Sequence, residues 1–202
     1  MPTDVTLPAF IETVAAGDRN AVAAVLRSHP EFAVEALDRA DERFHEMIGH
    51  QLYAGDTALH VAAAAYYTVI ARELATAGAD IAAVNRRGAQ PLHCAVRGGP
   101  GAPGWDPAAQ RAIIACLVAL GADPDARDKT GTTPLLRAVR NRCADAVDAL
   151  LEAGADPHRT NKRGSTAMDL AGWTTGRGGT GTAEAKAQQE RIVAALQAAD
   201  VR

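Results

Sequence analysis

The stretch Gly131-Thr-Thr-Pro-Leu-Leu136 decides the fold, because close copies of it recur along the chain. The other copies begin at Gly55, Gly88 and Gly164, so that successive glycines are separated by 33, 43 and 33 residues. A second phrase, Gly-Ala-Asp, begins at positions 78, 121 and 154 and keeps the same period. A fixed period of this length indicates a stacked repeat protein, in which each unit buries its apolar face only against its neighbours.

Each unit predicts a turn followed by two helices, most clearly in the copy around Gly131. Gly131 suits a turn position with positive φ. Thr133 is placed to cap a helix that begins at Pro134, where the missing amide hydrogen does no harm. A second helix is indicated by the Val-x-x-Leu-Leu pattern at 147–151, and Gly154 fits the left-handed position that ends it.

These residues resemble the signature of ankyrin repeats, Gly-x-Thr-Pro-Leu-His-x-Ala followed by Val-x-x-Leu-Leu and Gly-Ala-Asp. The resemblance covers roughly residues 8–202 and implies an all-α solenoid of about five helix-turn-helix repeats. Short finger turns are expected beside a concave face, with two long insertions between helices. Tyr66 and Arg142 depart from the pattern, since the family usually has glycine between the two helices.

We expect a single domain over residues 1–202, made of consecutive repeats. The expected units are an N-terminal capping repeat at 8–30, an inserted helix at 31–52, internal repeats at 53–84, 85–127 and 128–160, and a C-terminal capping repeat at 161–202.

Composition limits the class of protein. Apolar residues make up 48% of the chain but aromatic ones only 4%, which favours closely packed helices with small side chains. A net charge of -3 and a pI of about 6.1 predict neither nucleic-acid nor membrane binding from bulk charge. The three cysteines (Cys94, Cys116, Cys143) lack paired spacing, which favours reduced thiols. Without a secretory signal or a membrane-spanning apolar run, we expect a soluble, cytoplasmic protein.

Three segments interrupt the repeat period. Residues 31–52 predict an extra amphipathic helix beside the binding edge, with an apolar stripe of Val34, Leu37, Phe44, Met47 and Ile48. Residues 97–110 separate the helices of the third repeat and predict a turn-rich loop, after which Asp106 and Pro107 start a helix. Residues 172–182 separate the helices of the last repeat, and a helix is expected again from 184 to 197.

The second and third insertions contain the only two tryptophans of the chain and lie one repeat apart. One hypothesis is therefore that they meet and form a small-molecule or anion-binding site, with catalysis left open. Its residues would be Arg97, Trp105, Arg142, Trp173 and Arg177. Tolerated surface loops are the alternative, because doubling the length of a loop costs only about 0.6 kcal/mol. The insertions also resemble segments of bacterial ankyrin proteins, Gly-Trp-x-Pro-Ala-x-Gln and Thr-Gly-Arg-Gly-Gly, for which no activity is implied.

The sequence offers little catalytic chemistry. His60 and His93 occupy the motif position that, by resemblance, ties neighbouring repeats together through hydrogen bonds rather than binding a metal. Cys143, near a helix–helix turn, is a candidate for an exposed thiol. Since no nucleophile–base pair, paired carboxylates or set of metal ligands is present, we expect no enzyme, no cofactor and no metal site.

The best functional signal is charge on the face that ankyrin repeats use for recognition. The partner-binding residues implied by the resemblance are Tyr53, Asp56, Arg86, Arg87, Lys129, Arg140, Asn141, Lys162 and Arg163. Together with Arg97, this face has seven basic residues and one acid on an acidic chain. It predicts a protein partner with an acidic or phosphorylated surface, since arginine suits bidentate contact with carboxylate or phosphate. A solvated basic edge without a partner is the alternative. Nucleic acid ranks last, because the basic residues are not interleaved with aromatic ones.

Overall fold

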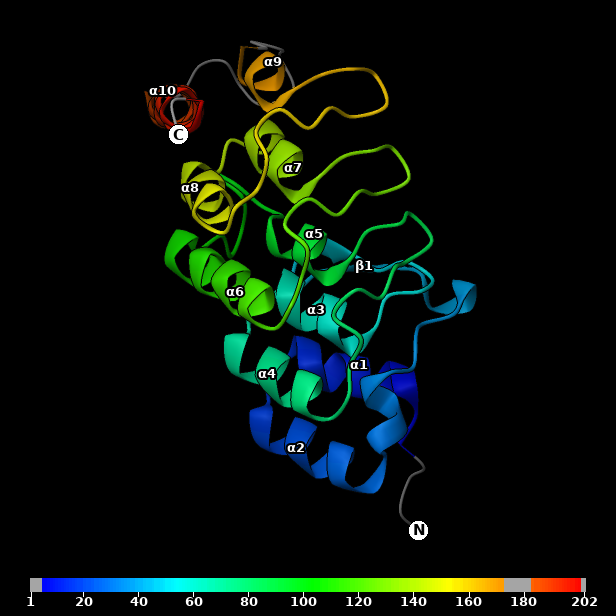
Figure 1. The fold of residues 1–202 in the computed structure, drawn as a ribbon. Coiled ribbons are helices and arrows are strands. Elements are labelled where there is room, and N and C mark those ends of the chain that lie inside the picture. The colour runs from blue at the N-terminus through cyan, green and yellow to red at the C-terminus, as the bar shows by residue number, and fades with distance from the viewer. Residues whose placement is uncertain (1–4, 173–182, 201–202) are drawn as a thin grey trace.

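The computed structural model describes residues 5–172 and 183–200, and over these residues the chain is a stack of five helix pairs (Figure 1). The pairs are α1 (Leu7–Ala15) with α2 (Arg19–Ser28), α3 (Ala58–Ala64) with α4 (Thr68–Thr76), α5 (Pro91–Ala95) with α6 (Pro107–Ala119), α7 (Pro134–Arg140) with α8 (Ala144–Glu152), and α9 (Ala167–Gly172) with α10 (Ala183–Ala199). The all-α solenoid expected from the repeat period is confirmed.

The helices form two layers. In Figure 1 the first helix of each pair belongs to an inner layer, and the second belongs to an outer layer on its left. Inner helix α3 packs against α1 and α5, and outer helix α6 packs against α4 and α8. The turns that precede α3, α5, α7 and α9 project away from the outer layer as fingers, at residues 53–57, 85–90, 128–133 and 161–166.

Local signals start the inner helices where the sequence predicts. Thr133 has extended backbone angles, and its side chain accepts a hydrogen bond from the amide of Leu136 at 3.2 Å. Pro134 is the first residue of α7, and Gly131 has a φ of 75°. The predicted turn, cap and helix start are therefore confirmed in this unit.

Two residues replace glycine in the turn between paired helices. Tyr66 and Arg142 have φ values of 62° and 59°. No other non-glycine residue in the described part of the chain has a positive φ. A left-handed backbone costs such a residue roughly 1–2 kcal/mol. Tyr66 offsets this cost, because its ring is buried and its hydroxyl donates to the carbonyl of Arg97 at 2.5 Å.

The predicted amphipathic helix at 31–52 is wrong. The segment contains two short 3-10 helices, η1 (Pro30–Ala33) and η2 (Arg39–Asp41), and a hairpin in which β1 (Phe44–His45) pairs antiparallel with β2 (His50–Gln51). Phe44 and Met47 of the expected apolar stripe are 56% and 70% exposed. The backbone at Leu37 instead pairs with the first finger, since its amide donates to Asp56 and its carbonyl accepts from Gly55. Contacts distant in sequence thus overrode a weak helical pattern.

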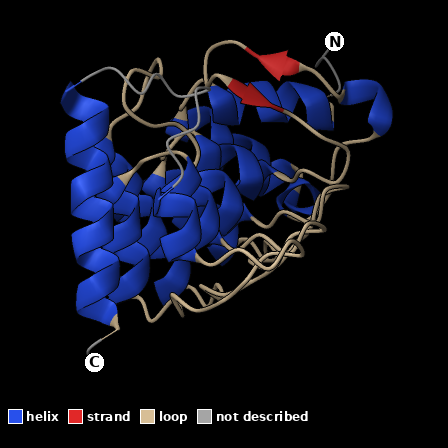
Figure 2. Cartoon of the chain, turned by 90° about the horizontal axis from the view of Figure 1, so that it is seen from above, coloured by secondary structure: helices blue, strands red, loops and turns tan. Residues whose placement is uncertain are grey.

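The hairpin lies along the inner side of the stack (Figure 2), next to α1. His45 Nε2 lies 2.8 Å from a carboxylate oxygen of Glu12 in α1, and Arg43 forms an ion pair with the same carboxylate. At the hairpin turn, the carbonyls of Ile48 and Gly49 accept hydrogen bonds from the guanidinium of Arg97, which follows α5.

The second insertion has the predicted organisation. After a turn-rich loop, Asp106 caps α6 by accepting from the amides of Ala108 and Ala109 at 2.9 and 3.0 Å, and Pro107 is the first helical residue. The third insertion lies outside the described residues beyond Gly172, and the expected last helix is present as α10. Among the described residues, no helix is long and apolar enough to cross a bilayer.

Candidate functional site

The motif histidines hold the scaffold together. His60 Nδ1 accepts from the amide of Thr57 at 3.1 Å, and its Nε2 lies 3.0 Å from the carbonyl of Ala89 in the next finger. His93 repeats the arrangement with Gln90 and with the carbonyl of Thr132. Because a carbonyl can only accept, Nε2 carries the proton in both rings. Burial lowers the pKa of His93 to about 4, so this imidazole stays neutral at physiological pH.

The fingers form one hydrogen-bonded row. The amide of Lys129 donates to the carbonyl of Arg87 at 2.9 Å, and the amide of Lys162 donates to that of Thr130 at 3.0 Å. A Cβ on Gly131 would lie 2.9 Å from the amide nitrogen of Lys162, so only glycine permits this approach. The finger tips, with their basic side chains, are therefore held in a fixed register.

Tyr53 and Glu42 contact basic side chains of the second finger. The guanidinium carbons of Arg86 and Arg87 lie 5.1 and 5.3 Å from the centroid of the Tyr53 ring. Arg86 also donates to Glu42 at 2.9 Å, and Glu42 accepts from the amide of Ala54. The Ala54 amide and Arg86 hold the pKa of Glu42 below its ordinary value. Arg86 is thus neutralised within the fold, whereas Arg87 keeps its charge unpaired among the described residues.

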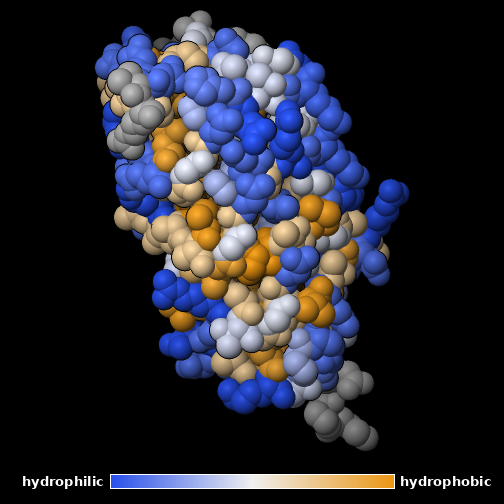
Figure 3. Space-filling model, viewed as in Figure 1, coloured by the Kyte–Doolittle hydropathy of each residue, from blue (hydrophilic) through white to orange (hydrophobic). Residues whose placement is uncertain are grey.

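A hollow of about 230 Å³ lies between the last two inner helices and their fingers. It is lined by Thr130, Leu136, Arg140, Asn161, Arg163 and Leu170, among others. No residue of the inserted segment 31–52 is among its lining residues. In the space-filling view of the same face as Figure 1, hydrophilic side chains predominate over the C-terminal repeats, whereas apolar ones show across the middle of the stack (Figure 3).

Comparison with known proteins identifies the repeats. A family model described as "Ankyrin repeats (many copies)" matches residues 117–171, and one described as "Ankyrin repeat" matches residues 54–86. The chain is an ankyrin repeat protein.

Several curated relatives match parts of the chain. Ankyrin repeat and SOCS box protein 16 of Mus musculus is 38% identical over 117 residues, which are 57% of this chain and 25% of that protein. Protein fem-1 homolog A of Rattus norvegicus is 45% identical over 58 residues, or 29% of this chain and 9% of that protein. Neurogenic locus notch homolog protein 4 of Homo sapiens is 36% identical over 110 residues, which are 53% of this chain and 5% of that protein. The chain therefore spans a quarter or less of these relatives. Its resemblance to bacterial proteins stays a prediction.

Four of the nine predicted partner-binding residues contribute to the ankyrin fold itself. Asp56 is buried, accepts from the amide of Tyr53 and from Asn85 Nδ2 at 2.8 Å each, and is not accessible to a partner. Burial raises the pKa of its carboxyl group. Asn141 is half-buried and donates to the carbonyl of Val96 at 2.9 Å. Tyr53 and Arg86 contact each other as described. The other five are exposed, namely Arg87, Lys129, Arg140, Lys162 and Arg163.

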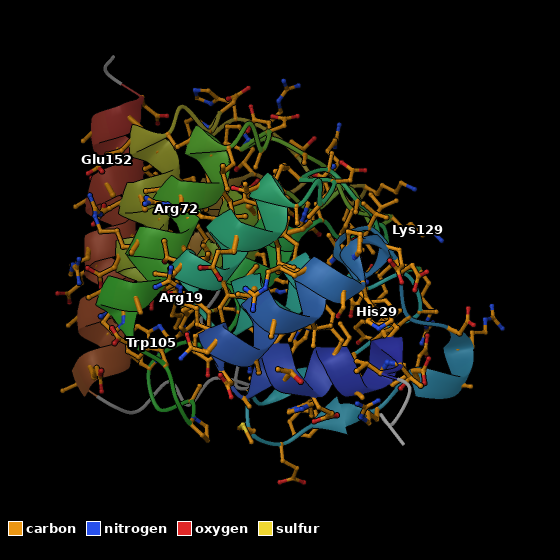
Figure 4. All side chains as sticks on the ribbon, turned by 90° about the horizontal axis from the view of Figure 1, so that it is seen from below. Arg19, His29, Arg72, Trp105, Lys129 and Glu152 are labelled. Carbon is orange, nitrogen blue, oxygen red and sulfur yellow. The ribbon has the colours of Figure 1, made fainter. Side chains whose placement is uncertain are left out.

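The possible ligand residues of the second insertion also have structural partners. Arg97 binds the hairpin turn, and the Trp105 indole donates to the side-chain oxygen of Gln110 at 3.1 Å. Gln110 is buried and donates to the carbonyl of Arg97 at 2.7 Å, which closes the loop on itself. Figure 4 shows Trp105 beside the loop that leads into α6. Arg142 is half-buried at its strained turn. Trp173 and Arg177 lie outside the described residues.

The cysteines are not available for chemistry. Cys94, Cys116 and Cys143 are free and buried, so the prediction that Cys143 is exposed is wrong. Its thiol donates to the carbonyl of Gly98 at 2.8 Å, because the second insertion folds back over the turn. Burial raises the pKa of Cys143 to about 12. Among the described residues, no three His, Cys, Asp or Glu side chains form a group that could hold a metal ion.

Proposed function

We propose that this chain is a non-catalytic module that binds another protein, with an acidic surface, through the fingers and inner helices of its C-terminal repeats. The observation that supports this most directly is a row of exposed basic side chains without a carboxylate partner among the described residues. The row consists of Arg87, Lys129, Arg140, Lys162 and Arg163. We call it the basic row.

The distribution of charge over the stack supports the proposal. On the outer side, three arginines are matched by acids across neighbouring helices, in the ion pairs of Arg19 with Glu73, Arg111 with Glu152, and Arg191 with Asp145 and Asp148. The chain as a whole has a net charge of -3. The five residues of the basic row lie on the finger side without such pairs among the described residues, and there an acidic partner would be attracted and oriented.

The scaffold type points the same way. Stacked repeats present an extended concave surface to a binding partner, and ankyrin repeats generally bind other proteins. The buried motif histidines His60 and His93 and the three buried thiols offer no activated nucleophile, which favours binding over catalysis. We also propose a cytoplasmic location, supported by the three unpaired cysteines.

The test compares two charge reversals of equal size. Lys129→Glu with Lys162→Glu changes two finger tips, whereas Arg27→Glu with Lys186→Glu changes two exposed residues of the outer helices α2 and α10. A protein retained from lysate by the immobilised chain would be identified and purified, and its affinity measured by calorimetry at low and physiological ionic strength.

We expect the finger reversal to weaken binding by at least about tenfold, equivalent to about 1.4 kcal/mol, and the outer reversal to have little effect. Wild-type binding should also weaken as ionic strength rises, because exposed charges are screened. Equal affinities for the two double variants would refute the basic row as the binding surface.

A further inference from the structure

The hollow between α7 and α9 combines unpaired positive charge with an apolar floor. Arg140, the last residue of α7, and Arg163, at the tip of the last finger, contribute two guanidinium groups. Neither group has a hydrogen-bond or ion-pair partner within residues 5–172 and 183–200. Leu136 and Leu170 contribute the apolar part.

The acids of the adjoining finger and of α9 already have partners. Asp128 forms an ion pair with Arg137 at 3.0 Å, and its other carboxylate oxygen accepts from the hydroxyl and amide of Thr130 at 2.6 and 2.8 Å. Asp169 of α9 accepts from the amide and hydroxyl of Thr166, both at 2.8 Å, and so caps its own helix. No carboxylate among the described residues forms an ion pair with Arg140 or Arg163.

Arg140 is affected both by burial and by neighbouring positive charges. Partial burial of its guanidinium is the main cause that lowers the pKa of Arg140, and the charges of Arg137 and Arg87 lower it further. Asp128 opposes the effect without reversing it. Because an anion would relieve this repulsion, Arg140 favours a negatively charged ligand.

Further donors line the same hollow. Asn161 accepts from the amides of Arg163 and Ser165 through its side-chain oxygen, at 2.8 and 3.2 Å. That pattern fixes the orientation of the amide group, whose nitrogen has no acceptor among the described residues. The volume of about 230 Å³ is below the roughly 300–1,000 Å³ typical of pockets for small molecules, so side chains of a partner fit better than a cofactor.

We propose that this hollow binds an anionic side chain followed by an aliphatic side chain in an extended segment of the protein partner. Arg140 and Arg163 hold the carboxylate or phosphate group, and Leu136 and Leu170 contact the aliphatic group. The inference rests on the proposed function and names the kind of segment recognised. It differs from the general charge attraction of the basic row, because it requires an apolar neighbour beside the acid.

The experiment uses fluorescein-labelled peptides with identical Gly/Ser flanks and different central pairs. The pairs are Glu-Leu, phosphoserine-Leu, Gln-Leu and Glu-Ala, and binding to the full chain is measured by fluorescence anisotropy. We expect Glu-Leu to bind about tenfold more tightly than Gln-Leu or Glu-Ala, given the usual strengths of charged hydrogen bonds and of leucine burial. Binding of phosphoserine-Leu alone would assign the site to phosphorylated segments, and binding of both acids would show that a carboxylate suffices.

Variants tie the peptide to the hollow. Arg140→Gln with Arg163→Gln should reduce Glu-Leu or phosphoserine-Leu binding about tenfold, whereas Arg27→Gln with Lys186→Gln should leave it unchanged. Circular dichroism melting curves verify that both variants stay folded. The proposal would be overturned if neither acidic peptide bound more tightly than Gln-Leu, or if the two double variants bound the acidic peptide equally well. Tighter binding of a single-stranded oligonucleotide that depends on the same two arginines would also overturn it.

The outcome separates this inference from the broader one. In one outcome, reversal of Lys129 and Lys162 weakens binding of the purified partner while replacement of Arg140 and Arg163 leaves it unchanged. In that case the basic row binds the partner, and the hollow is excluded as a binding site. If neither pair matters, both proposals fail.

Discussion

Replacing Gly131 with alanine measures how closely neighbouring fingers approach each other. Gly131 has a φ of 75°, a conformation that costs an alanine about 1–2 kcal/mol. The new Cβ would lie 2.9 Å from the amide nitrogen of Lys162, so the next finger must shift. That amide donates to Thr130 at 3.0 Å, and weakening this hydrogen bond costs about 0.5–1.5 kcal/mol. We expect Gly131→Ala to lower the free energy of unfolding by about 2–3 kcal/mol.

Two other glycines provide controls for the backbone strain alone. Gly164 and Gly121 have φ values of 77° and 101°, and a Cβ on either would meet no atom within 4 Å. We expect alanine at these positions to cost only about 1–2 kcal/mol. Gly164 lies in the last finger and Gly121 lies in the exposed turn after α6, in a middle repeat, so the pair also controls for the position of a repeat in the chain.

Urea denaturation followed by circular dichroism measures the three variants, with linear extrapolation to water. If close backbone contact holds the fingers in register, Gly131→Ala is the least stable by about 1 kcal/mol or more. A loss for Gly131→Ala no larger than that for Gly164→Ala and Gly121→Ala would refute the reasoning.

Three more predictions follow from particular contacts. Arg142→Gly should raise the thermal midpoint slightly, because glycine adopts a φ of 59° without strain. Tyr66→Gly should instead lower the free energy of unfolding by about 3 kcal/mol or more, because a buried ring is lost. Equal effects of the two substitutions in thermal melts would contradict the stabilising role of the Tyr66 ring. Burial lowers the pKa of His93 from 6.5 to about 4. As the pH falls, the unfolded chain therefore binds a proton at this histidine before the folded chain does. The contribution of His93 to stability is complete above pH 6.5 and is lost as the pH falls towards 4. His93→Gln should therefore make the unfolding free energy less dependent on pH in this window by up to about 1.4 kcal/mol per pH unit, and an unchanged slope would count against a buried neutral imidazole. Arg97→Gln should accelerate amide hydrogen exchange in the hairpin but not in α8, since Arg97 donates to Ile48 and Gly49; uniform exchange across both would show that Arg97 does not hold the hairpin.

The repeat pattern predicted the helices because its signals are local. Gly131, Thr133 and Pro134 act on the backbone within one turn of themselves, so their roles can be predicted without knowledge of the rest of the chain. The motif histidines were predicted correctly on resemblance, and their partners in the next finger follow from the regular stacking of the units.

The inserted segments were harder to predict because their partners lie far away in the sequence. The hairpin at 44–51 depends on Glu12 and Arg97, on either side of it in the chain. An apolar stripe alone did not distinguish a helix from this extended arrangement. Glu42 was missed as a functional neighbour for the same reason, since nothing near it in the sequence indicates its ion pair with Arg86.

By itself the sequence determined the solenoid, the positions of its fingers and the excess of basic residues along them, because a strict repeat converts position in the chain into position in space. Only the tertiary structure decided which of those charges remain available. Arg86 and Arg97 are engaged by a glutamate and by hairpin carbonyls, whereas Arg140 and Arg163 face a hollow without a partner among the described residues. The physical reason is that ion pairs and hydrogen bonds depend on distances across the fold, and the spacing of residues along the chain does not specify those distances.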